Sequence, residues 1–168
     1  NPTALAAPIL GTAAFQVAVG VSPVNLAEDP YHATNVVKLA YSLQEAGMAV
    51  GYSGNMKDYN LNQSISATFK QFAVAPIALI NVLDPKRHKA GIPKTDCRVD
   101  AMQATVSIEG ILLDTLAVEA GGTALQLDTD YIAGFDDDGH AVITLLESGA
   151  GAAATSLSVS GDKIDPSQ

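Results

Sequence analysis

Residues 60–85 read NLNQSISATFKQFAVAPIALINVLDP and join a helix pattern to a strand pattern. The helix pattern is a stripe of apolar residues at i, i+4, i+8 and i+11, namely Leu61, Ile65, Phe69 and Phe72. This spacing predicts a helix that is capped by Asn60 and turns one apolar face toward a core. Pro76 ends the helix, because proline lacks the amide hydrogen that a helix interior needs. The apolar run 77–83 then predicts a strand at the centre of a sheet, buried on both faces.

The residues before this stretch predict further elements of the same layer. Ser42 and Glu45 have the spacing of a capping box, which predicts a short helix that ends near residues 47–51. Residues 36–39 predict a neighbouring strand, and residues 9–10 with their flanks predict another. The order of strand, helix, helix and strand indicates a small α/β layer, with two helices and a partly parallel sheet.

Charge divides the chain into two unequal parts. The whole chain carries 18 acidic and 9 basic side chains, a net charge of −9. Residues 1–95 hold seven Lys and Arg against five Asp and Glu, or +2, whereas residues 96–168 hold two against thirteen, or −11. Such asymmetry predicts two domains, 1–95 and 96–168. Their boundary is expected in the polar stretch 84–96, which contains two prolines and a glycine.

The acidic part has the pattern of an all-β unit. Short apolar or alternating runs recur at 105–108, 116–118, 131–135, 141–146 and 156–160. Asp138-Gly139 between two of these runs is a hairpin signal, because glycine tolerates the positive φ that such turns need. Further turns are expected at 121–122 and 149–151. The chain as a whole is therefore predicted to be α+β, with the α/β layer followed by an acidic unit that is sandwich-like or barrel-like.

Composition excludes several classes of protein. Hydrophobic residues make up 48% of the 168 residues and charged residues 16%, which excludes a disordered polar chain. Cys97 is the only cysteine, so an intramolecular disulfide and a multi-cysteine zinc site are excluded. No apolar run approaches the roughly 20 residues of a spanning helix, and residues 1–12 lack a basic leader. Because the chain is acidic, we predict no direct contact with nucleic acid and no membrane insertion.

Two short motifs resemble functional signatures, but for each of them an ordinary loop is the favoured interpretation. Residues 149–154 fit GxGxxA, but a pyrophosphate needs a helix N-terminus after the turn, and a strand pattern follows instead. Residues 51–55 resemble a nucleophile elbow around Ser53, but the final glycine is missing. The three histidines, which belong to no serine or cysteine constellation in the sequence, are His32, His88 and His140.

Two charged clusters also have plain interpretations. Asp136–Asp138, with Asp128 and Asp130 nearby, could gather Ca²⁺, but the spacing of an EF-hand is absent and a solvated hairpin turn is favoured. Residues 86–89, KRHK, could bind nucleic acid or phosphate; a solvated connector, or a contact with an acidic surface of another subunit, is favoured. Cys97, expected in the linker, is interpreted as an inert thiol. We assign no catalytic, cofactor-binding or metal-binding residue and predict that the chain is not an enzyme.

The order of several segments resembles that of contractile phage tail sheath proteins. The segments that carry this resemblance are PILGTA at 8–13, VVKL at 36–39, SLQEA at 42–46, DYNL at 58–61 with the helix that follows, and VAPIALINVLDP at 74–85. They resemble the entry strand, the ring-forming α/β segment and the strand ending in Asp-Pro of that family. DTDY at 128–131 and DDDG at 136–139 resemble the β-rich insertion found there.

The resemblance implies a structural subunit that polymerises and contracts. In this family the subunits form hexameric rings that stack helically around a tail tube protein, between a baseplate and a tail terminator. Contraction drives the tube through a cell envelope, and no cofactor or active site is needed. The resemblance implies location in the contractile tail of a virion, after assembly in the cytoplasm of a bacterial host. The chain lacks an initiator Met and ends where the family's α/β core would resume, so we expect an N-terminal and middle fragment, with 96–168 as an insertion domain.

Two other functions remain open at this point. The strand series of the acidic part also suits a non-enzymatic binding module that recognises a glycan or a protein. An enzyme is the least supported alternative, because the sequence names no convergent acid, base or nucleophile.

Overall fold

The apolar run that begins at Ile77 forms the central strand of a three-stranded sheet in the computed structural model, which describes residues 16–168. The sheet contains β1 (Gln16–Gly20), β2 (Val37–Ala40) and β3 (Ile77–Asn81), in the order β1-β3-β2. Four of the five side chains of β3 are buried, which confirms the prediction of a sheet-centre strand. The predicted strand at residues 9–10, and the PILGTA segment, lie outside the described residues.

This sheet is partly parallel, as predicted, and its directions follow from the connections. β3 runs parallel to β1 and antiparallel to β2. β2 and β3 are the two strands that flank the pair of helices. A single helix between two strands brings the chain back to the start of the sheet, so that the second strand runs parallel to the first. Two successive helices separate β2 from β3, and this connection lets β3 run antiparallel to β2. The strand–helix–helix–strand segment therefore does not supply the parallel pair, and β1 does.

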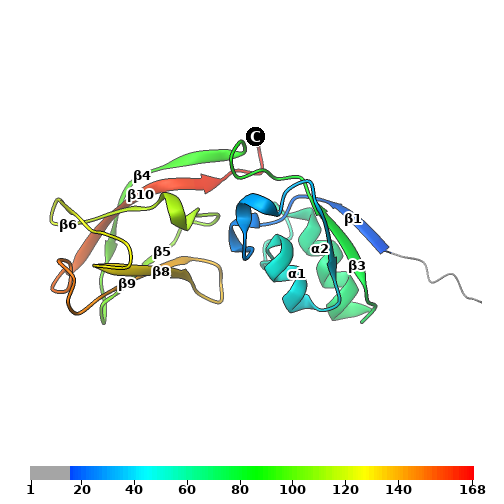
Figure 1. Cartoon of the computed structure of the whole chain (residues 1–168), viewed down its shortest axis with the longest axis horizontal. Coiled ribbons are helices and arrows are strands. Elements are labelled where there is room, and N and C mark those ends of the chain that lie inside the picture. The colour runs from blue at the N-terminus through cyan, green and yellow to red at the C-terminus, as the bar shows by residue number, and fades with distance from the viewer. Residues whose placement is uncertain (1–15) are drawn as a thin grey trace, which may run out of the picture.

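Both predicted helices are present and lie on the same side of the sheet (Figure 1). α1 (Leu43–Val50) begins with the predicted capping contact, in which the Glu45 amide donates to Ser42 Oγ at 3.1 Å. The carboxylate of Glu45 accepts from the Tyr41 amide at 2.9 Å, so two of the free donors at this end are satisfied. Gly51 ends the helix with a φ of 82°, the left-handed conformation that favours glycine.

The second helix departs from its prediction at both ends. α2 (Asn60–Ser66) is capped by Tyr59, and Asn60 instead accepts a hydrogen bond from the Val21 amide at 2.7 Å. The chain then continues as a π-helix, η3 (Ala67–Gln71). A π-turn holds more residues than an α-turn, so it rotates the residues after it around the helix axis. Phe72 is consequently 69% exposed, and the prediction that it completes the buried stripe is wrong.

The rotation gives a direct prediction for two neighbouring phenylalanines. Phe69 packs against the core of the α/β layer, whereas Phe72 does not. We expect Phe69→Ala to lower the free energy of unfolding by about 2 kcal/mol and Phe72→Ala to change it by less than about 0.5 kcal/mol. Urea unfolding followed by circular dichroism measures both values. Equal losses at the two positions would show that the helix is a continuous α-helix through Phe72.

The remainder of the chain folds into two sheets around a second core. One sheet contains β4 (Lys89–Arg98), β10 (Ser156–Ile164), β6 (Ala117–Ala120) and β7 (Thr123–Ala124), in that order. The other contains β5 (Gln103–Val106), β9 (Ala141–Leu145) and β8 (Tyr131–Phe135). Both are antiparallel and neither closes into a barrel. The hairpin β8–β9 around Asp138-Gly139 and the strand at 156–160 are confirmed, so the described chain is mixed α+β with mostly β-strands.

β4 occupies most of residues 84–96, for which the sequence predicts a linker, and that prediction is wrong for residues 89–96. Pro93 suggested a break, but β4 is an edge strand, where a missing amide hydrogen costs little. A bulge also lies there, because the register with β10 shifts between Val159 and Gly161. Cys97 is buried in the β core instead of lying in a linker. The division into two domains at residue 95 stays a prediction.

We name the part formed by β1–β3 and the helices the α/β lobe, and the part formed by β4–β10 the β lobe; they lie side by side (Figure 1). Three short 3-10 helices lie near the junction between them, namely η1 (Val24–Leu26), η2 (Pro30–His32) and η4 (Leu113–Thr115). A third buried cluster joins the lobes, formed by Val24, Ala27, Ala33, Tyr59, Leu83, Leu112 and Ile164. Among residues 16–168, none of the helices is long and apolar enough to cross a bilayer.

Candidate functional site

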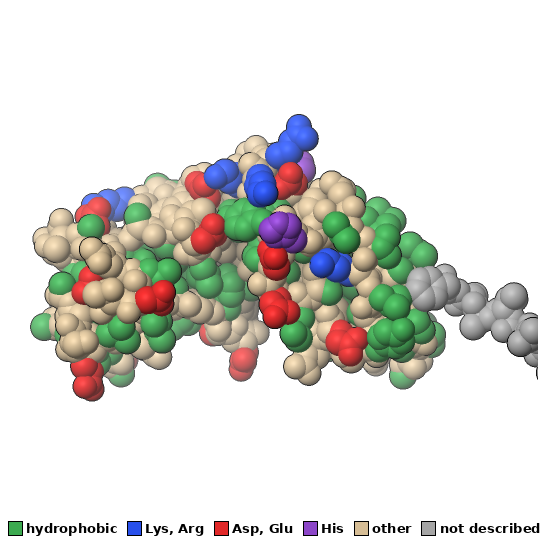
Figure 2. All heavy atoms as spheres, in the orientation of Figure 1, with side chains coloured by type: hydrophobic (Ala, Val, Ile, Leu, Met, Phe, Trp, Pro, Cys, Tyr) green, Lys and Arg blue, Asp and Glu red, His purple; other side chains and the backbone are tan. Residues whose placement is uncertain are grey.

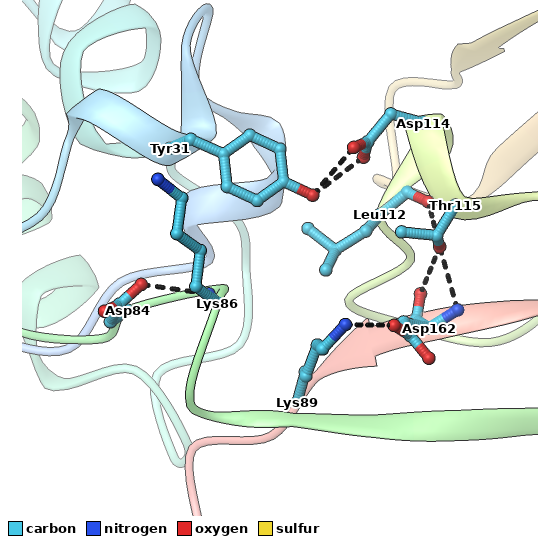
Figure 3. Close-up of polar contacts among 8 residues, drawn as sticks. All are labelled: Tyr31, Asp84, Lys86, Lys89, Leu112, Asp114, Thr115 and Asp162. Carbon is cyan, nitrogen blue, oxygen red and sulfur yellow. Dashed lines mark hydrogen bonds and ion pairs between the residues drawn. The ribbon is translucent and has the colours of Figure 1, made fainter.

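Polar contacts fasten the two lobes beside this shared cluster (Figure 3). Tyr31 of the α/β lobe donates its hydroxyl to both carboxylate oxygens of Asp114 in the β lobe, at 2.8 and 3.0 Å. Thr115 accepts from the Asp162 amide at 2.8 Å and donates to the Leu112 carbonyl, which ties η4 to β10. Burial and the neighbouring Asp114 carboxylate raise the pKa of Tyr31 to about 12, so its hydroxyl stays a donor through neutral pH.

The tyrosine contact predicts a measurable alkaline transition. Because the folded pKa of Tyr31 is about 12 and the pKa of an unfolded tyrosine is about 10, its contribution to stability is present below pH 10 and is lost as the pH rises toward 12. In a titration of phenolate absorbance, we expect Tyr31→Phe to remove one of the groups that ionise near pH 12. Removal of a group that ionises near pH 10 instead would contradict the contact with Asp114.

A cleft of about 710 Å³ lies between the lobes. The α/β lobe contributes Pro23, Asn25, Leu26, Tyr52, Ser53, Gly54, Asn55 and Tyr59; the β lobe contributes Glu109, Gly110 and the hairpin residues 135–140. Asn55 spans the lobes by donating to Glu109 Oε2 at 3.0 Å. The cleft has the size of pockets that hold small ligands or a group of side chains.

The walls of this cleft are strongly negative. Glu109 and Asp136–Asp138 supply four carboxylates, and no Lys or Arg is among the lining residues. Burial raises the pKa of Tyr59 to about 12, and the negative charges of Glu109 and Asp58 add to this shift. The side chain of Asn25 is 4% exposed, and its amide oxygen has no hydrogen-bond partner among the described residues. An acidic cleft with an unpaired acceptor suits cationic groups that carry N–H donors.

The structure brings two of the sequence motifs to this cleft without forming a catalytic group. Ser53 and His140 both line it. However, Ser53 Oγ accepts from the Asn55 amide at 3.3 Å and from Asn62 Nδ2 at 3.2 Å, while His140 Nδ1 lies 3.5 Å from Asp136 Oδ2. Within the described chain, Ser53 makes no hydrogen bond to a histidine, so the loop interpretation of residues 51–55 is favoured.

Residues 149–154, which fit GxGxxA, form a turn before β10, as the loop interpretation predicts. Asp130 occupies one amide of this turn, since it accepts from Ala150 N at 2.7 Å, and it also accepts from Gln126 N at 2.8 Å. These two hydrogen bonds lower the pKa of the Asp130 carboxyl. Asp130 is thus a structural residue whose carboxylate connects the turn at Gln126 to the turn at Ala150.

The acidic hairpin is likewise held by its own backbone. Asp136 Oδ1 accepts from the amides of Asp138 at 3.0 Å and His140 at 2.8 Å, and these bonds lower the pKa of Asp136. In the part of the chain that the structure describes, no three His, Cys, Asp or Glu side chains gather in a way that could hold a metal ion. The hairpin is a polar turn, and Asp137 and Asp138 are exposed at its tip.

The basic cluster at 86–89 is divided between the lobes. Lys89 forms an ion pair with Asp162, and Lys86 lies over the ring of Tyr31 at 5.7 Å, so both stay on the junction (Figure 3). Arg87 is exposed and forms no ion pair within residues 16–168. Part of the cluster therefore contacts the acidic β unit of its own chain.

An apolar face that no other element of residues 16–168 covers lies on the other side of the three-stranded sheet, away from the helices; we call it the uncovered apolar face. Ala18 and Leu79 point to the helices, whereas their sequence neighbours point outward. The outward set consists of Val17, Val19, Val37 and Leu39, whose cross-strand partners in β3 are Ala78 and Ile80. Hydrophobic side chains are accordingly prominent on this lobe (Figure 2). No prediction from the sequence covers this face, although the alternation in QVAVG at 16–20 indicates it.

Comparisons complete this description. The chain matches no known family model, curated protein or solved structure. The function of the protein is therefore inferred from its own residues and geometry.

Proposed function

We propose that this protein is a structural subunit of a contractile tail sheath and polymerises through its α/β lobe. The observation that carries the proposal is the uncovered apolar face of the sheet β1-β3-β2. Large apolar side chains on one continuous face are unfavourable in water, and such faces typically mark surfaces that pack against another protein. Strands β1 and β2 are both at sheet edges and can also accept a further strand.

The remaining features agree with a structural role. In the described part of the chain the cleft gathers no triad, because Ser53 bonds to Asn55 and Asn62. The polar clusters of the β lobe stabilise turns and the junction between the lobes. In this proposal residues 96–168 are the acidic, sandwich-like insertion domain and residues 1–95 belong to the packing core. The partners are other copies in hexameric rings, the tail tube protein, the baseplate and the tail terminator. The location is the contractile tail of a virion assembled in a bacterial host cytoplasm.

Electron microscopy tests this proposal. The protein is expressed in a bacterial host with its adjacent genes, and the resulting particles are labelled with an antibody against the exposed turn at residues 121–124 of the β lobe. We expect the label along hollow helical tubes that shorten and widen on triggering. Label confined to other structures, or a protein that never enters particles, would contradict the sheath role.

A further inference from the structure

The turn that joins β3 to β4 presents two cations on a fixed backbone. Asp84 holds the turn, because its carbonyl accepts from the amides of Arg87 at 3.0 Å and His88 at 2.8 Å. Its carboxylate also accepts from the Lys86 amide at 2.9 Å (Figure 3). Lys86 and Arg87 are exposed on this turn. We call residues 84–88 the basic turn.

The acidic cleft offers a complementary surface. Glu109, Asp137 and Asp138 are exposed, and none of them forms an ion pair within residues 16–168. Neighbouring carboxylates repel one another, so a cation between them lowers their mutual repulsion. The unpaired oxygen of Asn25 lies in the same wall and adds an acceptor. The cleft thus has carboxylates but no Lys or Arg among its lining residues, and the basic turn supplies two such cations.

The two surfaces do not face each other within one molecule. The basic turn lies at the upper edge of the molecule in Figure 1, near the C-terminus, whereas the hairpin between β8 and β9 projects between the lobes lower in the view. Most of the visible Lys and Arg side chains lie along that upper edge (Figure 2). Complementary surfaces at different positions on identical subunits give a head-to-tail contact, which closes into a ring or continues as a helix.

We propose that the basic turn of one copy binds the acidic cleft of a second copy, with Lys86 and Arg87 against Asp137 and Asp138. The contact rests on the proposed function, in that it names one interface of the assembly. It is separate from the apolar sheet face, which lies on another surface of the α/β lobe. Its electrostatic character makes it sensitive to salt, unlike the apolar contact.

Charge exchange between two variants tests this contact. The chain has two arginines, so Arg87→Glu is compared with Arg98→Glu, an exposed control with the same change in charge. Sedimentation analysis is expected to show self-association weakened about 10-fold or more by Arg87→Glu and by Asp138→Arg, and unchanged by Arg98→Glu. An equimolar mixture of Arg87→Glu with Asp138→Arg restores association, because each variant again meets an opposite charge.

Carbodiimide coupling of the wild-type protein supplies a second readout. It joins amines to carboxylates in direct contact, and mass spectrometry should find Lys86 linked to Asp137 or Asp138 between copies labelled with different isotopes. The contact is overturned if Arg87→Glu associates like Arg98→Glu, if the mixture gives no rescue, or if the wild type is monomeric at all concentrations. Sheath tubes that form normally from Arg87→Glu would overturn this contact alone and leave the sheath role standing.

Discussion

A chain that carries both Val19→Glu and Val37→Glu is expected to fold normally and to lose self-association. The two valines are 59% and 63% exposed and flank Ile80 on the uncovered face, so their replacement costs the monomer little. In a packed interface each valine would contribute about 1.5 kcal/mol, and each glutamate would have to lose its hydration. We therefore expect association to weaken at least about 100-fold.

Sedimentation equilibrium measures this effect, and circular dichroism checks the fold. The matched control is Leu127→Glu with Ile132→Glu, which places the same charges on exposed apolar residues of the β lobe. Equal losses of association in the two double variants would indicate a general charge effect. Unchanged association in the sheet variant would rule out this face as the packing surface.

The second large effect is expected from Gly51→Ala, at the end of α1. A Cβ atom at this position would lie 2.0 Å from the carbonyl oxygen of Pro23, and the backbone φ is 82°. The contact is with backbone, which cannot move without displacing η1 and the buried Val24. We expect a loss of about 3 kcal/mol or more in the free energy of unfolding, and a melting temperature lower by about 10 °C.

Gly54→Ala is the control for this substitution, because Gly54 lies in the same loop with nothing within 4 Å of its Cβ position. Its free energy of unfolding should change by less than about 0.5 kcal/mol. Chemical unfolding of both variants at the same pH makes the comparison. A loss below 1 kcal/mol at Gly51 would mean that the connection between α1 and η1 is more adaptable than its packing indicates.

Local signals predicted the elements whose stability comes from nearby residues. The capping box at Ser42 placed the start of α1, and Asp138-Gly139 placed the hairpin β8–β9. The apolar run at Ile77 identified the central strand, because burial on both faces removes polar alternation. In each case the interaction that decides the structure lies within a few residues of the signal.

Other features depend on distant partners and gave no local signal. β4 exists because β10, some 60 residues later, pairs with it around a bulge beside Pro93. The π-turn displaces Phe72 without any mark in the spacing of the apolar residues. The cleft combines residues of both lobes, so no single stretch of sequence contains it. The sequence marks the histidines and Ser53 as candidates by their residue type, whereas nothing in the sequence distinguishes the unpaired Asn25 from any other asparagine.

The pairing of β4 with β10 has a consequence for how such a chain can vary. The chain enters the β lobe at Lys89 and leaves it at Ile164, and these two residues are paired with each other. The next residues out, His88 and Asp165, are joined by a hydrogen bond of 2.9 Å. Because entry and exit are adjacent, residues 89–164 can lengthen, shorten or be exchanged while the flanking backbone keeps its path. The β lobe therefore has the connectivity of a replaceable cassette, which can diversify without disturbing the packing of the α/β lobe.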